Sequence, residues 1–154
     1  DDGGAAEGRF PLNELAIDMA TDNLLLGAGA NNFAYVMPDY PEPEFTRIWV
    51  YTVHNKYLLV WSEVGTFGLI SFVSFLLVTL GCAWRVWRIG HRFYSVLALA
   101  LLGAVAGHAV HLSVDIFNNR PIVQMLWMFS GLIMALYAMT REKNKVDTHS
   151  RFAS

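Results

Sequence analysis

Three long stretches without a charged side chain constrain this 154-residue sequence more than any other feature. Residues 64–83, 93–114 and 121–140 contain no Asp, Glu, Lys or Arg. At a rise of about 1.5 Å per residue, each stretch is long enough as an α-helix to cross the ~30 Å hydrocarbon core of a bilayer. Only 16% of the residues are charged, whereas soluble domains contain about 25%. The sequence therefore predicts an all-α membrane protein with three transmembrane helices.

Charge is distributed unevenly along the chain. Residues 1–50 carry a net charge of −7, and residues 51–154 carry +5. The overall charge of −2 argues against a general nucleic-acid-binding protein. A single cysteine, Cys82, excludes an internal disulfide framework and a multi-cysteine metal site. We expect an extramembrane segment over residues 1–56, partly helical, followed by a three-span membrane region over 57–154.

Basic residues near the ends of the spans predict the orientation. Seven follow the first or third span, and three lie near the opposite ends. The seven are Arg85, Arg88, Arg92, Arg141, Lys143, Lys145 and Arg151, and the three are Arg47, Lys56 and Arg120. Because Lys and Arg concentrate on the cytoplasmic side, we expect the C-terminus to be cytoplasmic. Residues 1–56 and the turn 115–120 would then face outward, toward the periplasm in a bacterium.

The outward segment begins with a pattern that predicts a helix over residues 10–26. Its apolar positions recur at helical spacing, and its acidic positions recur on another face. The apolar set is Leu12, Leu15, Ala16 and Met19, and the acidic set is Glu14, Asp18 and Asp22. We expect Gly27 to end this helix and residues 27–33 to form a turn-rich loop. This loop lacks the third glycine of a dinucleotide fingerprint and the Gly-Lys-Ser/Thr of a P-loop, which argues against nucleotide binding.

Two polar residues of this segment are candidates for chemistry. Arg9 lies just before the predicted helix, where a guanidinium and free backbone N–H groups can both bind an anion. The plain alternative is a solvated arginine. His54 lies at the water–membrane boundary, and its unperturbed pKa of about 6.5 suits a general base. The alternative is an interfacial residue that caps a helix.

Other polar residues are expected to support the structure. Glu63 begins the apolar region, where an unpaired acid is costly, so we expect it to pair with another buried group. We expect nearby Gly65 to permit close helix packing. On one continuous helix, Glu63 and His54 would lie on opposite faces. His111 and Asp115, at i and i+4, are expected to interact while facing the interior of the bundle. No sharp metal-binding signature accompanies them, so we expect no metal site.

The ordered set of motifs resembles a known family. In order, these are Gly8-Arg9, a short helix, Gly27-x-Gly29-x-x-x-Phe33, His54-Asn55 and Glu63-x-Gly65. This series resembles the C-terminal part of the bacterial O-antigen ligase and polymerase superfamily, over roughly residues 8–75. The later spans agree in layout. Because that family has many additional upstream spans, the resemblance implies that this chain is the C-terminal fragment of a larger membrane enzyme.

The resemblance implies transfer of a glycan at the periplasmic face of the inner membrane. The donor would be a glycan on a polyprenyl diphosphate such as undecaprenyl diphosphate, and lipid A–core the expected acceptor. Another glycan chain and a protein hydroxyl are alternative acceptors. Arg9 would stabilise the departing diphosphate, and His54 would accept the hydroxyl proton, with Asn55 in support. Arg47, Lys56 and Arg120 are candidate auxiliary phosphate contacts. Because the donor is already activated, the resemblance implies no cofactor.

Two other functions remain open at this point. An O-antigen or exopolysaccharide polymerase of the same superfamily would use the same type of donor, but would extend the glycan rather than attach it. A non-enzymatic membrane scaffold or transporter fragment would use its polar residues to line a path through the membrane. In that case Arg9 and His54 would be dispensable.

Overall fold

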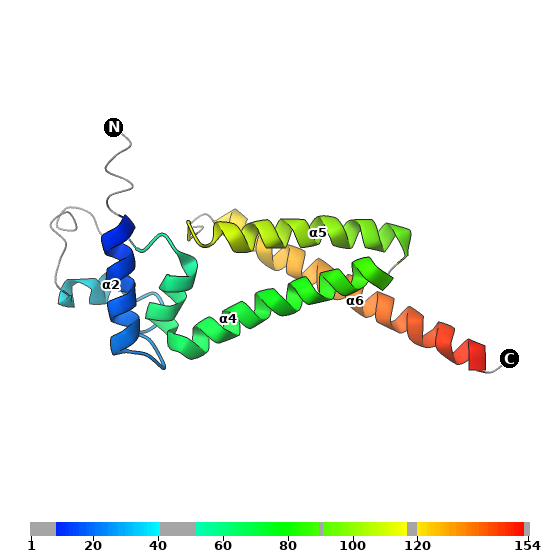
Figure 1. Ribbon diagram of the computed structural model, residues 1–154, viewed down its shortest axis with the longest axis horizontal. Helices are drawn as coiled ribbons and strands as arrows, with labels where there is room; N and C mark the ends of the chain where they lie inside the picture. Colours follow the sequence, from blue (N-terminus) through cyan, green and yellow to red (C-terminus); the bar gives the residue numbers. More distant parts are fainter. Residues whose placement is uncertain (1–8, 41–51, 90, 117–119, 153–154) are drawn as a thin grey trace, which may run out of the picture. The chain divides into compact units, whose positions relative to one another are not determined.

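The computed structural model describes residues 9–40, 52–89, 91–116 and 120–152, with side chains over 12–40, 52–89, 91–116 and 121–143. The described residues form helices and turns, with no strand among them (Figure 1). The helices are α2 (Arg9–Asp22), α3 (Phe33–Val36), the 3-10 helix η1 (Met37–Asp39), α4 (Lys56–Ile89), α5 (Arg92–His111) and α6 (Arg120–Phe152).

Three of these helices are long and apolar enough to cross a membrane. They are α4, α5 and the part of α6 over Pro121–Lys143. All three predicted spans fall largely within them. The sequence-based prediction of an all-α protein with three membrane-crossing helices is therefore confirmed.

The chain divides into two compact units. The motif unit comprises residues 1–73 and 110–116, and the span unit comprises residues 74–109 and 117–154. This division follows packing, and it assigns the first part of α4 to the motif unit. All the sequence motifs that carry the family resemblance therefore belong to the motif unit.

Helix α2 has the buried face that its sequence predicts. The four apolar positions predicted to face the core, Leu12, Leu15, Ala16 and Met19, are at most 5% exposed, and the acidic positions of the other face are exposed. The helix ends at Asp22, however, rather than continuing to Gly27. Two backbone groups that would continue it bond elsewhere, because the Leu24 carbonyl accepts from Thr66 and the Ala28 N–H donates to the Ser62 carbonyl. The helix is shorter than expected because these bonds to α4 replace its last turn.

One hydrophobic core holds the motif unit together. Met19 from α2, Phe33 from α3 and Val53 from the segment before α4 are all fully buried in it. Leu59 extends the same core into α4, and Ile116 packs against it from the segment after α5. Residues far apart in the sequence therefore share one packed interior.

Helix α4 is interrupted at Gly65. This residue has φ 73° and ψ −172°, outside the helical region, and a bend is visible near the start of α4 (Figure 1). The 34 residues of α4 would extend about 51 Å if straight, more than one bilayer core requires. The part from Thr66 to Ile89 would extend about 36 Å. The break therefore leaves a membrane-length helix after a short first segment.

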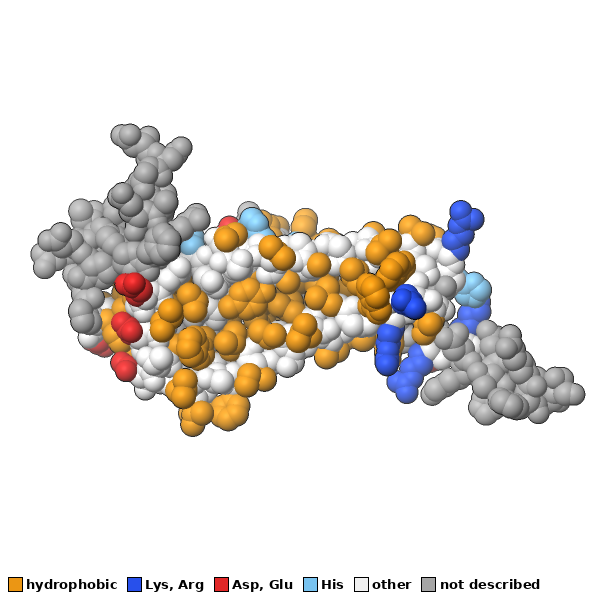
Figure 2. Space-filling model, viewed as in Figure 1, with side chains coloured by type: hydrophobic (Ala, Val, Ile, Leu, Met, Phe, Trp, Pro, Cys, Tyr) orange, Lys and Arg blue, Asp and Glu red, His pale blue; other side chains and the backbone are white. Residues whose placement is uncertain are grey.

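The span unit is built by apolar packing. Its buried residues recur every three or four positions, as helix packing requires. The apolar ones are Leu76, Ala83 and Val86 of α4, Ala98, Leu101 and Val105 of α5, and Leu126, Ile133 and Leu136 of α6, and the polar ones are Thr79, Ser130 and Thr140. The rings of Phe75 and Trp127 pack with their centroids 5.0 Å apart. Hydrophobic side chains also cover the outside of these helices (Figure 2), which is the composition that a lipid-facing surface requires.

Candidate functional site

The glycine-rich loop and the break in α4 bind each other through backbone hydrogen bonds. The break frees the carbonyls of Ser62 and Glu63 from the helical pattern. The first accepts from the Ala28 N–H at 2.8 Å, and the second accepts from the Gly29 N–H at 2.9 Å. Buried carbonyls need partners, and the loop supplies both. We call this contact, between residues 24–29 and 62–66, the interlock.

Thr66 completes the interlock from the other side of the break. Its N–H donates to the Leu24 carbonyl at 2.8 Å, and its hydroxyl donates to the same oxygen at 2.7 Å. The Trp61 indole N–H in turn donates to the Thr66 hydroxyl at 3.1 Å. One threonine therefore joins the loop to both sides of the helix break. Neither Thr66 nor Trp61 belongs to the motifs that carry the family resemblance, so the sequence did not predict this contact.

Two motif glycines are required by the geometry of the interlock. Gly27 and Gly65 have φ of 69° and 73°, in the left-handed region that favours glycine. A Cβ on Gly27 would overlap the backbone of Glu63, and one on Gly65 would overlap the backbone of Leu25. Gly65 thus permits a close approach, as expected, but of a loop rather than of another helix.

The Glu63 side chain bonds across the interlock to a second helix. Its Oε1 accepts from the Phe33 N–H at 3.1 Å. Phe33 begins α3, so the carboxylate satisfies a backbone donor that has no partner within its own helix. The expected pairing of Glu63 is observed, and its partner is a backbone amide. Because His54 precedes α4, His54 and Glu63 do not lie on one continuous helix.

His54 lies between two fixed neighbours. Val53 before it is fully buried in the core. Asn55 after it caps α4, with its Oδ1 accepting from the backbone N–H groups of Tyr57 at 3.0 Å and Leu58 at 3.2 Å. The Lys56 N–H donates to the Leu112 carbonyl at 2.8 Å. The backbone around His54 is therefore held on both sides, while its side chain remains half-buried.

The structure describes the predicted cationic residues unequally. Lys56 is the first residue of α4, and its side chain is half-buried. Arg9 and Arg120 are the first residues of α2 and α6, but their side chains lie outside the described part of the chain, as does the whole of Arg47. A meeting of these side chains with His54 therefore stays a prediction.

The predicted pair of His111 and Asp115 lies where α5 ends, with His111 as the last residue of the helix. His111 Nε2 and Asp115 Oδ2 are 3.7 Å apart, with side chains 54% and 44% exposed. They interact as expected, but they are not enclosed within the described helices. His108, one turn earlier, contacts the Ala104 carbonyl at 3.2 Å and packs edge-on against Phe129. Among the described residues, no three potential ligands are grouped to hold a metal ion.

These features define a helical, multi-pass membrane protein that contains an interlocked motif unit. Residues 1–73 match the family described as O-antigen ligase. The match ends where the main segment of the motif unit ends, and it contains the interlock and His54. The family resemblance inferred from the motifs is therefore confirmed for this part of the chain. No curated protein and no solved structure compared with the chain matches it.

Proposed function

We propose that this chain belongs to a membrane enzyme that transfers a glycan from a polyprenyl diphosphate to an acceptor hydroxyl. The reaction takes place at the periplasmic face of the bacterial inner membrane, with lipid A–core as the acceptor. One observation carries the proposal: the O-antigen ligase match covers residues 1–73, which contain His54 and the complete interlock. Residues 1–56 face the periplasm, and the C-terminus faces the cytoplasm.

The proposed reaction is a substitution at the anomeric carbon of the donor sugar. The acceptor oxygen forms a bond to this carbon as the bond between the carbon and the diphosphate oxygen breaks. The electron pair leaves with the polyprenyl diphosphate, and the hydroxyl proton passes to a base. Two tasks follow, which are stabilisation of the charge on the leaving diphosphate and acceptance of the proton.

We assign the proton to an imidazole nitrogen of His54 and the diphosphate to the guanidinium of Arg9. The assignments rest on the order of the family motifs. The shared core supports them, because Leu12, one turn after Arg9, and Val53, beside His54, belong to the same cluster. A close-packed core restricts relative movement of its elements, and restricted movement favours productive alignment of two catalytic groups. Lys56, Arg47 and Arg120 are proposed auxiliary contacts to the phosphates.

The assignments can be tested in a strain that lacks the gene and carries the full-length protein. We expect His54→Ala and Arg9→Ala each to reduce attachment of glycan to lipid A–core by about 10²-fold or more. Arg9→Lys keeps the charge and should retain part of the activity. Glu14→Gln changes an exposed side chain of the same helix and should behave as wild type. Wild-type attachment in correctly inserted His54→Ala and Arg9→Ala variants would exclude both roles.

The strain that lacks the gene, without the full-length protein, separates a ligase from a polymerase. Loss of a ligase leaves a complete polymer on the lipid carrier, whereas loss of a polymerase leaves single repeat units. We expect the lipid-linked polymer to accumulate. Accumulation of single units would reassign the chain to polymerisation, and normal glycan at the surface would favour a scaffold or transporter.

A further inference from the structure

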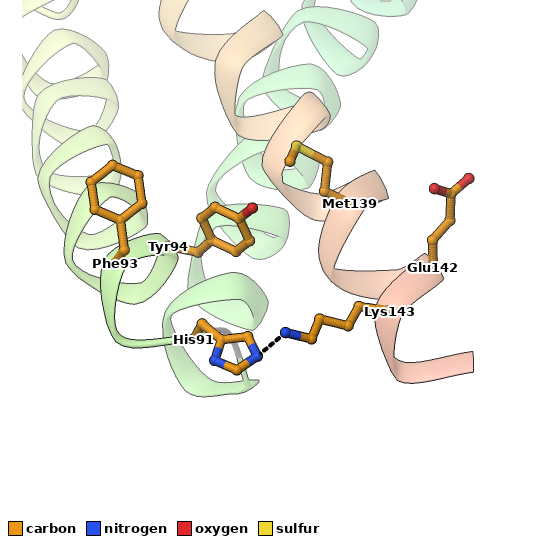
Figure 3. A pocket seen from close by; sticks show the side chains of 6 residues that line it. All are labelled: His91, Phe93, Tyr94, Met139, Glu142 and Lys143. Carbon is orange, nitrogen blue, oxygen red and sulfur yellow. Dashed lines mark hydrogen bonds between the residues drawn. The ribbon is translucent and has the colours of Figure 1, made fainter. Parts of the chain in front are cut away.

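A pocket of about 550 Å³ lies at one end of the span unit, away from the proposed catalytic residues in the sequence. Its walls come from the start of α5 and from α6 near the end of its apolar part. The lining residues are His91, Phe93, Tyr94, Met139, Glu142 and Lys143 (Figure 3). All six belong to the span unit.

The pocket lies at a boundary between apolar and polar sequence. The uncharged stretch of α6 ends at Thr140, and that of α5 begins at Phe93. On the apolar side, Phe93 is 73% exposed and Met139 is 48% exposed. Phospholipid headgroups occupy this same boundary in a bilayer, with the acyl chains on the apolar side. The polar side of the pocket therefore suits a lipid headgroup, and its apolar side suits the acyl chains.

The polar end of the pocket is rich in positive charge. Figure 2 shows Lys and Arg side chains gathered at this end of the helices. The described cations here are Arg85, Arg88, Arg92, Arg141 and Lys143, and Glu142 is the acidic side chain described among them. Such an excess of cations attracts anionic headgroups rather than zwitterionic ones.

Two nitrogen groups converge inside the pocket. Lys143 Nζ contacts His91 Nε2, and Figure 3 shows these side chains directed toward each other from α6 and from the residue before α5. An ammonium group carries three N–H donors, and a neutral imidazole accepts one of them. Lys143 therefore retains donor capacity for a phosphate oxygen while His91 fixes its position.

Aromatic residues near the end of α4 also suit a membrane interface. The rings of Trp84 and Trp87 pack edge to face, with centroids 4.6 Å apart, and Trp84 is 49% exposed. Indole rings concentrate at the level of lipid headgroups. The local chemistry thus combines aromatic anchors, an excess of cations and an apolar wall.

We propose that this pocket binds the phosphodiester headgroup of an anionic phospholipid. Lys143 and His91 contact the phosphate, and Phe93 and Met139 contact the first part of the acyl chains. The apolar wall distinguishes this ligand from free phosphate, and the charge of the pocket distinguishes it from a zwitterionic lipid. The site is separate from the proposed glycan transfer and does not depend on it.

The experiment measures lipid selectivity in phosphatidylcholine vesicles that contain the full chain. Spin-labelled phosphatidylglycerol and spin-labelled phosphatidylcholine are compared by the immobilised fraction in their electron paramagnetic resonance spectra. We expect wild type to select phosphatidylglycerol by about fivefold, the attraction of roughly one basic residue near a membrane surface. Lys143→Gln should remove most of this selectivity, and Glu142→Gln should increase it.

Arg88→Gln is the matched control, because it removes one positive charge from the last turn of α4 and leaves the lining of the pocket unchanged. It should retain most of the selectivity. An equal loss in Arg88→Gln and Lys143→Gln would show diffuse electrostatic attraction and overturn the site. A wild-type protein without selectivity for phosphatidylglycerol would also overturn the proposed site. So would complete loss of this selectivity in the presence of soluble glycerophosphate, which has no acyl chains.

Discussion

The motif unit and the span unit are stabilised in different ways. In the motif unit, backbone groups far apart in sequence bond directly, as between Ala28 and Ser62 or Leu24 and Thr66. In the span unit, the buried positions are mostly aliphatic residues that repeat at helical spacing. Directed hydrogen bonds and glycine contacts leave few acceptable substitutions, whereas apolar cores tolerate volume-conserving exchanges. We therefore expect the motif unit to be much less tolerant of sequence change than the span unit.

Glycine substitutions should show the largest difference between the two units. Gly65→Ala and Gly27→Ala each place a Cβ against backbone at positive φ, so we expect a loss of about 3 kcal/mol or more in unfolding free energy. In the span unit, a Cβ at Gly81 or Gly103 meets no atom within 4 Å. Alanine there should be neutral or stabilise by up to about 1 kcal/mol. Thermal unfolding in detergent measures both, and equal effects in the two units would refute the contrast.

Loss of the Glu63 bond should have a smaller effect. Glu63→Ala leaves the Phe33 N–H without its carboxylate acceptor, and we expect a cost of about 1–3 kcal/mol. Glu63→Gln keeps an acceptor oxygen and should recover much of the stability. Proteolysis of the motif unit, followed over time, reports the local loosening. If Glu63→Gln were as damaging as Glu63→Ala, the bond to Phe33 would not be the reason for the acid.

The smallest expected effect concerns pH. Burial, and then the hydrogen bond that its hydroxyl donates to Asp22 Oδ2 at 3.0 Å, raise the pKa of Tyr40 above its ordinary 10.0. The stabilising contribution is therefore present below about pH 10 and is lost as the pH rises through the raised pKa. Wild type should melt slightly above Tyr40→Phe at neutral pH. This gap should close in alkaline buffer, and a gap that widened there would contradict the assignment.

The sequence predicted the parts of the fold that depend on local pattern. Uncharged stretches of membrane length predicted α4, α5 and α6, and the spacing from Leu12 to Met19 predicted the buried face of α2. These signals are local because hydropathy and helical periodicity are properties of one segment. The end of α2 at Asp22 and the break at Gly65 were not predicted, because both depend on bonds between two distant segments.

The candidate site was predictable only through the order of its motifs. His54 and Asn55 were identified as a pair, and the structure shows Asn55 capping α4. The partner of Glu63 could not be predicted, because it is a backbone N–H. Every residue except proline has this group, so the residue types do not indicate which one the carboxylate binds. The side-chain positions of Arg9 and Arg120 lie outside the described residues, so their roles stay predictions based on family resemblance.

A double-mutant cycle on glycan transfer tests the central claim most directly. Arg9→Ala, His54→Ala and the double variant are compared in the full-length enzyme, after membrane insertion is verified. If both groups act in one transition state, their effects on the transfer rate are strongly non-additive. The double variant should then be only slightly less active than the less active of the two single variants. Losses that multiply, or transfer at wild-type rate in either single variant, would contradict the proposal of one shared site.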